Sequence, residues 1–294
     1  MKLYNDIIIK GSRAISKSYA KINLTLDVLG RLENGYHEVK MIMQSLNLFD
    51  LVIVDKQDFG INISTNCKFL PNNDGNIAYK AAELFFKETG IAGGAKILIH
   101  KNIPVAAGLA GGSGNAAATL CSLNLLYNAE LSDSELERLA LKLGADVPYC
   151  LSGGTQLAEG IGERLTPLKP ICGAPVVLVK PPVSILTADI YRMIDSAPTL
   201  VHPNTDTMLH AIESSDTDRI CSNISNILES VTQELCPKVI SIKEKMLALG
   251  ALGTAMSGSG PTVFGIFPDN ATAKKACDSF SEKYDEVFLT HTIA

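Results

Sequence analysis

Alternating apolar and polar positions mark one early stretch of the chain. Between residues 18 and 29, apolar side chains fall at positions 20, 22, 24, 26 and 28, with polar ones between them. Since successive side chains of a strand point to opposite faces, this pattern predicts a strand with one buried face. Lys21 and Asn23 then lie together on the other face, off the core. On this pattern alone, a solvated surface is the commoner interpretation of that face, and a functional role is the alternative.

Apolar periodicity also predicts the other elements of the first half. A capping-box spacing joins Ser132 to Glu135, which marks the beginning of one helix, and Gly90 and Gly144 mark the ends of two helices. The predicted order is strands within 39–54, a helix at 77–89, a strand at 95–100, a helix at 113–127 and a helix at 132–143.

The second half predicts an α+β domain, because helices alternate with short strands that suit an antiparallel sheet covered on one side. A connection rich in proline lies within residues 152–182, so we place the domain boundary there and divide the chain into domains 1–165 and 166–294. The expected order is a strand at 175–182, a helix from about 187, helices between 205 and 249, strands at 254–256 and 261–267, a helix at 270–283 and a final strand at 286–293.

A loop rich in glycine and alanine, residues 104–118, separates the strand at 95–100 from the helix that follows. Glycines at 108, 111, 112 and 114 allow the backbone to bend sharply and to bring several N–H groups close to an anion. The first turn of the next helix adds unpaired donors. The spacing matches neither a Walker A loop nor a dinucleotide-binding turn, and a tight structural connection is the alternative interpretation.

Composition narrows the possible functions. The chain has 294 residues, 46% of them hydrophobic, and a net charge of −5, which predicts two globular domains. No run of Lys or Arg forms a basic patch, so we expect neither nucleic acid nor a membrane as the main partner. The sequence shows no signal-type segment or long apolar run, and its seven cysteines include no C-x-x-C pair. We therefore expect a cytoplasmic protein with reduced thiols; the five histidines have no metal-ligand spacing.

Two further sites carry candidate chemistry. Tyr36 and His37 follow the strong turn signal Asn34-Gly35, where they can stack on a flat ring or bond its edge, or serve as ordinary surface residues. Asp146 lies between small and apolar residues, where a carboxylate is either a turn or cap residue or a base in a partly dry site. An outward lysine, an anion loop and a protected aspartate are the residue types that phosphoryl transfer uses.

Four segments, taken in order along the chain, resemble the motifs of the GHMP kinase superfamily: AKINL at 20–24, PVAAGLAGGSGNAAATL at 104–120, GADVP at 144–148 and SGSGPTVFG at 257–265. The resemblance implies a two-domain α+β fold, with a ribosomal-protein-like N-terminal domain, a ferredoxin-like C-terminal domain and the active site between them. It implies ATP and Mg²⁺ as cofactors. The combination of AKINL, the segment NGYHE at 34–38 and GADVP resembles one member of the superfamily most closely, and that resemblance implies phosphorylation of the 2-hydroxyl of a cytidine diphosphate derivative of methylerythritol, in the non-mevalonate route to isoprenoid precursors.

Residue roles follow from the same resemblance. Lys21 and Asp146 are implied to be catalytic, Asp146 as the base and Lys21 beside it. The substrate-binding residues would be Asn23, Tyr36, His37, Thr187 and Tyr191, the last two from the segment PPVSILTADIY. The residues that would wrap the phosphates of ATP are Pro104, Val105, Ala106, Ala107, Gly108, Leu109, Ala110, Gly111, Gly112, Ser113 and Gly114.

Three departures from the family pattern bear on these roles. Ala110 replaces a common glycine, a mild change if its φ stays negative. Gly114 replaces a common serine and so removes a hydroxyl that is able to touch phosphate or metal, although Ser113 remains. Tyr19 replaces a proline and should affect only the entry of the strand. The alternatives are a kinase of the homoserine or mevalonate type, whose substrate has no base to stack, and a non-catalytic nucleotide or metabolite sensor.

Overall fold

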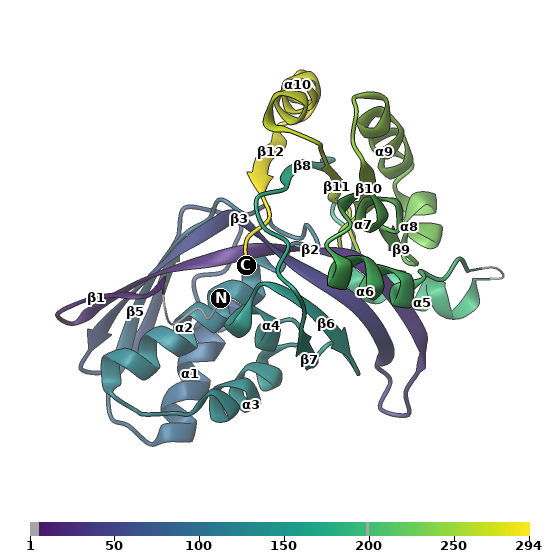
Figure 1. Ribbon diagram of the computed structural model, residues 1–294. Coiled ribbons are helices and arrows are strands. Elements are labelled where there is room, and N and C mark those ends of the chain that lie inside the picture. Colours follow the sequence, from purple (N-terminus) through teal and green to yellow (C-terminus); the bar gives the residue numbers. More distant parts are fainter. Residues whose placement is uncertain (1–5, 198–199) are drawn as a thin grey trace. The chain divides into compact units, whose positions relative to one another are not determined.

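The computed structural model describes residues 6–197 and 200–294 (Figure 1). These form two compact units that alternate along the chain. Unit 1 contains residues up to Ala20 together with Leu48–Val105 and Ala110–Gly153, and unit 2 contains Lys21–Asn47, Ala106–Leu109 and Gly154–Ala294. The sequence analysis placed one domain boundary between residues 165 and 166, with ATP binding in the first domain and substrate binding in the second. That assignment stays a prediction.

The sheet of unit 1 has the strand order β1-β2-β3-β5-β4. β5 pairs antiparallel with β3 and parallel with β4. β2 extends beyond the predicted 18–29 at both ends, and β3 is one continuous strand where separate strands were predicted within 39–54. The bounds are β1 Ile8–Lys10, β2 Arg13–Arg31, β3 His37–Gln57, β4 Gly60–Thr65 and β5 Gly94–His100.

The helices of unit 1 pack on one another through small side chains. Alanines at 78, 81 and 82 and at 116 to 118 are fully buried in one core, which allows the first two helices to approach closely. Figure 1 shows α1, α2 and α3 side by side. The predicted capping box is confirmed at Ser132 and Glu135, and α4 is a short helix where the pattern predicted only a turn. The bounds are α1 Ile77–Thr89, α2 Gly111–Tyr127, α3 Asp133–Leu143 and α4 Val147–Ser152.

The part of β2 in unit 2 is more buried than its alternating sequence pattern predicted. Both faces of this strand are buried, and Lys21 and Asn23 are only 3% and 0% exposed. Of the two interpretations of this face, the solvated surface is therefore wrong. β2 pairs in parallel with β9 (Ser225–Asn226), and β3 pairs with β6 (Thr155–Glu159). β6 pairs antiparallel with β7 (Arg164–Pro167), a short strand that ends in a proline and that the sequence pattern did not predict.

The second sheet of unit 2 confirms the expected antiparallel α+β arrangement. Its order is β10-β11-β8-β12, with every neighbouring pair antiparallel, and α9 and α10 pack against it. Over residues 6–197 and 200–294, no helix combines the length and apolar character needed to cross a lipid bilayer. The strands are β8 Pro175–Lys180, β10 Gly253–Met256, β11 Val263–Ile266 and β12 Glu286–His291. The helices are α5 Thr187–Ser196, α6 Thr205–Ser214, α7 Thr217–Ser222, α8 Glu229–Leu235, α9 Lys238–Ala248 and α10 Asn270–Ser281.

The cysteines differ in burial, and two of them, Cys172 and Cys221, should differ strongly in reactivity. Cys172 is exposed, whereas burial raises the pKa of the Cys221 thiol to about 11. At pH 8, roughly one Cys221 thiol in a thousand is then the reactive thiolate. We expect a brief treatment with Ellman's reagent at pH 8 to modify Cys172 and to leave Cys221 intact, as measured by peptide mass mapping. Denaturant should make both react, and equal labelling of the two in the native protein would contradict the burial.

Candidate functional site

The glycine-rich loop has an open helix N-terminus. Ala110 is the N-cap of α2 and has no side-chain acceptor for the first-turn N–H groups, which leaves these donors for another partner. Its φ is +55°, in the left-handed region, so the condition under which alanine would be a mild change at this position is not met. Ala106 also has a positive φ, +51°. Non-glycine residues seldom adopt this conformation, which is typical of loops held in place by their surroundings.

Gly114 has a packing reason for lacking a side chain. A Cβ built at this position would lie 2.3 Å from the hydroxyl oxygen of Ser18, which is itself buried. A side chain at position 114 would therefore point toward β2 and collide with it. The structure thus accounts for the departure from the family pattern by internal packing at this position.

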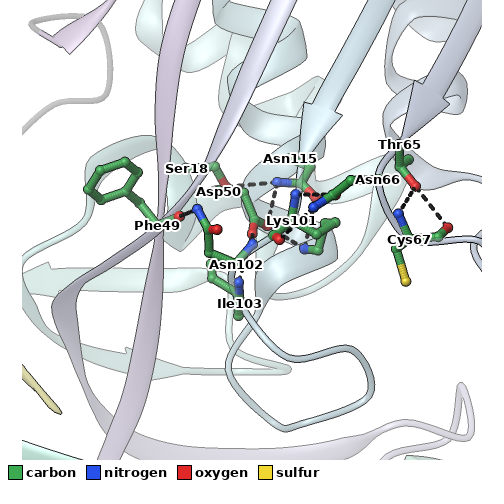
Figure 2. A network of polar contacts seen from close by, with 10 residues as sticks. All are labelled: Ser18, Phe49, Asp50, Thr65, Asn66, Cys67, Lys101, Asn102, Ile103 and Asn115. Atoms are coloured by element: carbon green, nitrogen blue, oxygen red, sulfur yellow. Dashed lines mark hydrogen bonds and ion pairs between the residues drawn. The ribbon is translucent and has the colours of Figure 1, made fainter. Parts of the chain in front are cut away.

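A buried polar network lies beneath this loop, and the sequence pattern did not reveal it. Asp50, on β3, is 0% exposed and forms an ion pair with Lys101. Figure 2 shows the carboxylate surrounded by the residues just before the loop and by Asn115 of α2. All of these residues belong to unit 1.

Lys21 is held by Asn23 in unit 2. The Lys21 ammonium donates to Oδ1 of Asn23 at 2.7 Å, and the backbone N–H of Gly258 donates to the same oxygen at 2.9 Å. The Lys21 backbone N–H donates to the carbonyl of Leu109 at 3.1 Å, which ties the strand to the glycine-rich loop. The burial of Lys21 thus comes from loops distant in sequence, one near residue 109 and one near residue 258.

The SGSG turn locks the middle of the glycine-rich loop. The Ser257 hydroxyl donates to the carbonyl of Gly108 at 3.0 Å. Gly108 has a φ of +73°, and a Cβ there would lie 2.0 Å from the Ser257 carbonyl oxygen. Asn226 holds the turn from the other side, because its Nδ2 donates to the carbonyls of Met256 and Gly258, each at 2.8 Å. Glycine is therefore required at position 108 by both conformation and space.

Two of the predicted ring-binding residues, His37 and Tyr191, meet at α5. The rings of His37 and Tyr191 lie 4.8 Å apart between centroids, and His37 Nε2 contacts Asp195 at 2.6 Å. Arg31 lies 3.6 Å from the same carboxylate. The sequence analysis missed Asp195 and Arg31. Asp195 lies 158 residues from His37, so no local spacing connects the two. Tyr36 is 59% exposed at the predicted turn.

The two remaining candidates occupy separate positions. The hydroxyl oxygens of Thr187 and Ser259 lie 2.8 Å apart, so the start of α5 meets the SGSG turn. Asp146 is the half-buried N-cap of α4, and its backbone carbonyl accepts the N–H of Cys150 at 3.2 Å. Lys21 belongs to unit 2 and Asp146 to unit 1, and their meeting over a phosphate stays a prediction.

Several known proteins that are similar to this chain are kinases of one family. Residues 76–154 match the family described as GHMP kinases N terminal domain, and residues 208–286 match GHMP kinases C terminal. The chain is 49% identical to the 4-diphosphocytidyl-2-C-methyl-D-erythritol kinase of Clostridium botulinum strain Eklund 17B, over 94% of this chain and 99% of that one. It is similar to a crystal structure of 4-(cytidine 5'-diphospho)-2C-methyl-D-erythritol kinase, with a TM-score of 0.81, 32% identity, and 95% and 99% of the two chains covered. The homoserine kinase of Cytophaga hutchinsonii shares the fold, with a TM-score of 0.78, 19% identity, and 98% and 96% covered.

Proposed function

The chain belongs to the GHMP kinase family, and we propose that it transfers the γ-phosphoryl group of ATP to the 2-hydroxyl of 4-diphosphocytidyl-2-C-methyl-D-erythritol. The observation that carries this proposal is the 49% identity to a kinase of that name over nearly its whole length. This reaction belongs to the non-mevalonate route to isoprenoid precursors. The homoserine and mevalonate alternatives are less favoured, because the solved structures of those kinases are only 16 to 20% identical to this chain and support the fold alone.

ATP binds at the glycine-rich loop in this proposal. Phosphoryl transfer needs positioning and charge stabilisation more than covalent chemistry from the protein. The first-turn N–H groups of α2 and the positive end of its dipole suit the phosphates, and the Cβ-free positions 111 and 112 let them approach closely. The eleven residues from Pro104 to Gly114 are the proposed phosphate site.

Lys21 and Asp146 act on the reacting groups. Asp146 accepts the proton of the attacking hydroxyl, and Lys21 orients that hydroxyl and offsets charge on the moving phosphoryl group. A tertiary hydroxyl is hindered and weakly acidic, so placement contributes more than proton removal. Asn23 shares one oxygen between Lys21 and the Gly258 backbone, which supports a role in orienting the ammonium in addition to its predicted contact with substrate.

The cytidine ring is held by the residues near α5. His37 and Tyr191 already lie ring against ring, and Asp195 fixes the imidazole from its edge. An exposed Tyr36 is available to stack on the base, and Thr187 lies at the start of the same helix as Tyr191. Aromatic stacking on a base contributes about 1–3 kcal/mol in single-stranded nucleic acid binding, which is enough to separate a cytidine substrate from a bare alcohol.

Mg²⁺ accompanies ATP in this proposal. The described residues include no group of three or more His, Cys, Asp or Glu able to hold a metal ion. That fits Mg²⁺, which kinases hold through substrate phosphates and one or two protein groups, and the half-buried Ser113 hydroxyl in the first turn of α2 is the candidate protein group. When bound, Mg²⁺ would neutralise the charge that develops during phosphoryl transfer. The cytoplasmic location remains a prediction from sequence.

A coupled assay of ADP release tests the proposed substrate. With ATP and Mg²⁺ present, we expect turnover of 4-diphosphocytidyl-2-C-methyl-D-erythritol and none above background for homoserine or mevalonate. Turnover of one of those alcohols alone would favour the corresponding kinase. ATP binding without turnover of any of the three would favour the non-catalytic sensor.

The same assay with ring variants tests the cytidine site. Tyr191→Ala should raise the KM for the cytidine substrate by about tenfold or more, because a stacking contact of 1–3 kcal/mol is lost. Tyr191→Phe keeps the ring and should bind substrate nearly as the unaltered chain does. The KM for ATP should stay unchanged in both variants, and an equal rise in the two KM values would contradict the assignment.

A further inference from the structure

We propose that Asp50 is a positioning residue for phosphoryl transfer, one carboxylate that fixes both ends of the glycine-rich loop. This inference rests on the proposed function, in which residues 104–114 hold the phosphates of ATP. Asp50 lies outside that loop, on β3, and is 0% exposed. It acts on ATP only through the backbone and side chains that it holds.

The first end of the loop is held through backbone N–H groups. Oδ1 of Asp50 accepts the N–H of Asn102 and the N–H of Ile103, both at 2.8 Å (Figure 2). Asn66 pairs with the backbone of Lys101 on both sides, accepting its N–H at 2.7 Å and donating to its carbonyl at 3.2 Å. The three residues that precede Pro104 are therefore fixed one after another, by a side chain of β3 and by one directly after β4.

The second end is held through α2. Oδ2 of Asp50 accepts Nδ2 of Asn115 at 2.9 Å and also accepts the Lys101 ammonium. Lys101 in turn donates to Oδ1 of Asn115 at 3.2 Å, and Asn115 also donates to the Ser18 hydroxyl at 3.2 Å. Asn115 begins the second turn of α2, directly beyond the first-turn N–H groups proposed to face the phosphates.

Charge and space make this arrangement sensitive to small changes. Lys101 has 6% of its side chain exposed, so each member of the ion pair would be left buried without its partner if the other were neutralised. The Lys101 ammonium lies 3.0 Å from the position of a Cβ on Gly111, directly beside the start of α2. The loop between the two ends contains Ala106 and Ala110 at positive φ, a conformation that needs such external support.

Asp50→Asn should break the contacts with Lys101 and Asn115 and keep those with the backbone N–H groups of residues 102 and 103. The new carbonyl oxygen still accepts the two backbone N–H groups, whereas the new amide faces the donors of Lys101 and Asn115. Asn115→Ala removes the hydrogen bond between α2 and Asp50 without changing a charge, and it provides a second variant if the first folds poorly. We expect each variant to raise the Kd for the ATP analogue AMP-PNP by about tenfold or more, the usual consequence of losing a buried charge-assisted bond. The KM for the alcohol substrate should not change.

A stability control separates positioning from general weakening. Phe85→Leu removes buried volume from the core of unit 1, away from the network, and should lower the melting temperature without changing the Kd for AMP-PNP. Isothermal titration at 25 °C compares the folded variants. If both variants fold and bind AMP-PNP as the unaltered chain does, the positioning role of Asp50 (the clamp) is overturned and the proposed function is not. Failure of the unaltered chain to bind AMP-PNP would overturn the proposed function, and the clamp with it.

Discussion

Asp146→Asn should lower kcat by roughly 10²–10⁴-fold while ATP still binds, because an amide of the same shape cannot accept the proton of the attacking hydroxyl. The half-buried position at the start of α4 places this side chain in a short, fixed turn, and no change of backbone is required for the substitution. Steady-state kinetics with the cytidine substrate measure kcat, and titration with AMP-PNP measures ATP binding.

Asp133→Asn provides the matched control for this experiment. Asp133 is an exposed carboxylate in the first turn of α3, in the same unit, and its neutralisation should leave kcat unchanged. A turnover of Asp146→Asn close to that of the unaltered chain would refute the role of Asp146 as base. Loss of both turnover and AMP-PNP binding would point instead to a structural role at the start of α4.

Gly108→Ala should disturb both stability and ATP binding. The added methyl group would lie 2.0 Å from the Ser257 carbonyl oxygen, and the backbone would have to keep a φ of +73°. We expect the free energy of unfolding to fall by about 2–4 kcal/mol, from the strained dihedral together with the overlap. The KM for ATP should rise by about tenfold or more, because the carbonyl of Gly108 can no longer meet the Ser257 hydroxyl in its present position.

Gly30→Ala is the control for the glycine prediction. Gly30 lies in β2, where an added Cβ meets nothing within 4 Å. This variant should unfold at the same urea concentration as the unaltered chain, within error, and should bind ATP normally. If Gly108→Ala were as stable as Gly30→Ala in urea titrations followed by circular dichroism, the close approach of the two loops would be wrong.

Local signals predicted the elements that depend on local chemistry. The capping box at Ser132 and the left-handed glycine at position 90 are written in short spacings, and both are present. The six-residue α4 was missed because it is too short for apolar periodicity to show and has a proline in its first turn.

Features that depend on distant loops were beyond reach of the sequence pattern. The alternation in β2 predicted a solvated Lys21, and the error has a tertiary cause: chain near Leu109 and Gly258 closes over that face. Asp50 gave no signal for a similar reason, since a lone aspartate in a strand does not reveal that backbone N–H groups 52 and 53 positions later bond to it. For the candidate site, spacing and resemblance supplied the proposed reacting residues, whose roles stay predictions, and the structure adds the groups that contact Lys21.

The bond from Ser257 to Gly108 joins residues 149 positions apart and has a consequence for biosynthesis. While the chain is still being made on the ribosome, the glycine-rich loop emerges long before the hydroxyl that holds its central carbonyl. A nascent chain that ends before Ser257 therefore lacks this support, and so does any fragment truncated there. In the proposed function, competence to bind nucleotide in the final geometry should arrive only after Ser257 has left the ribosome.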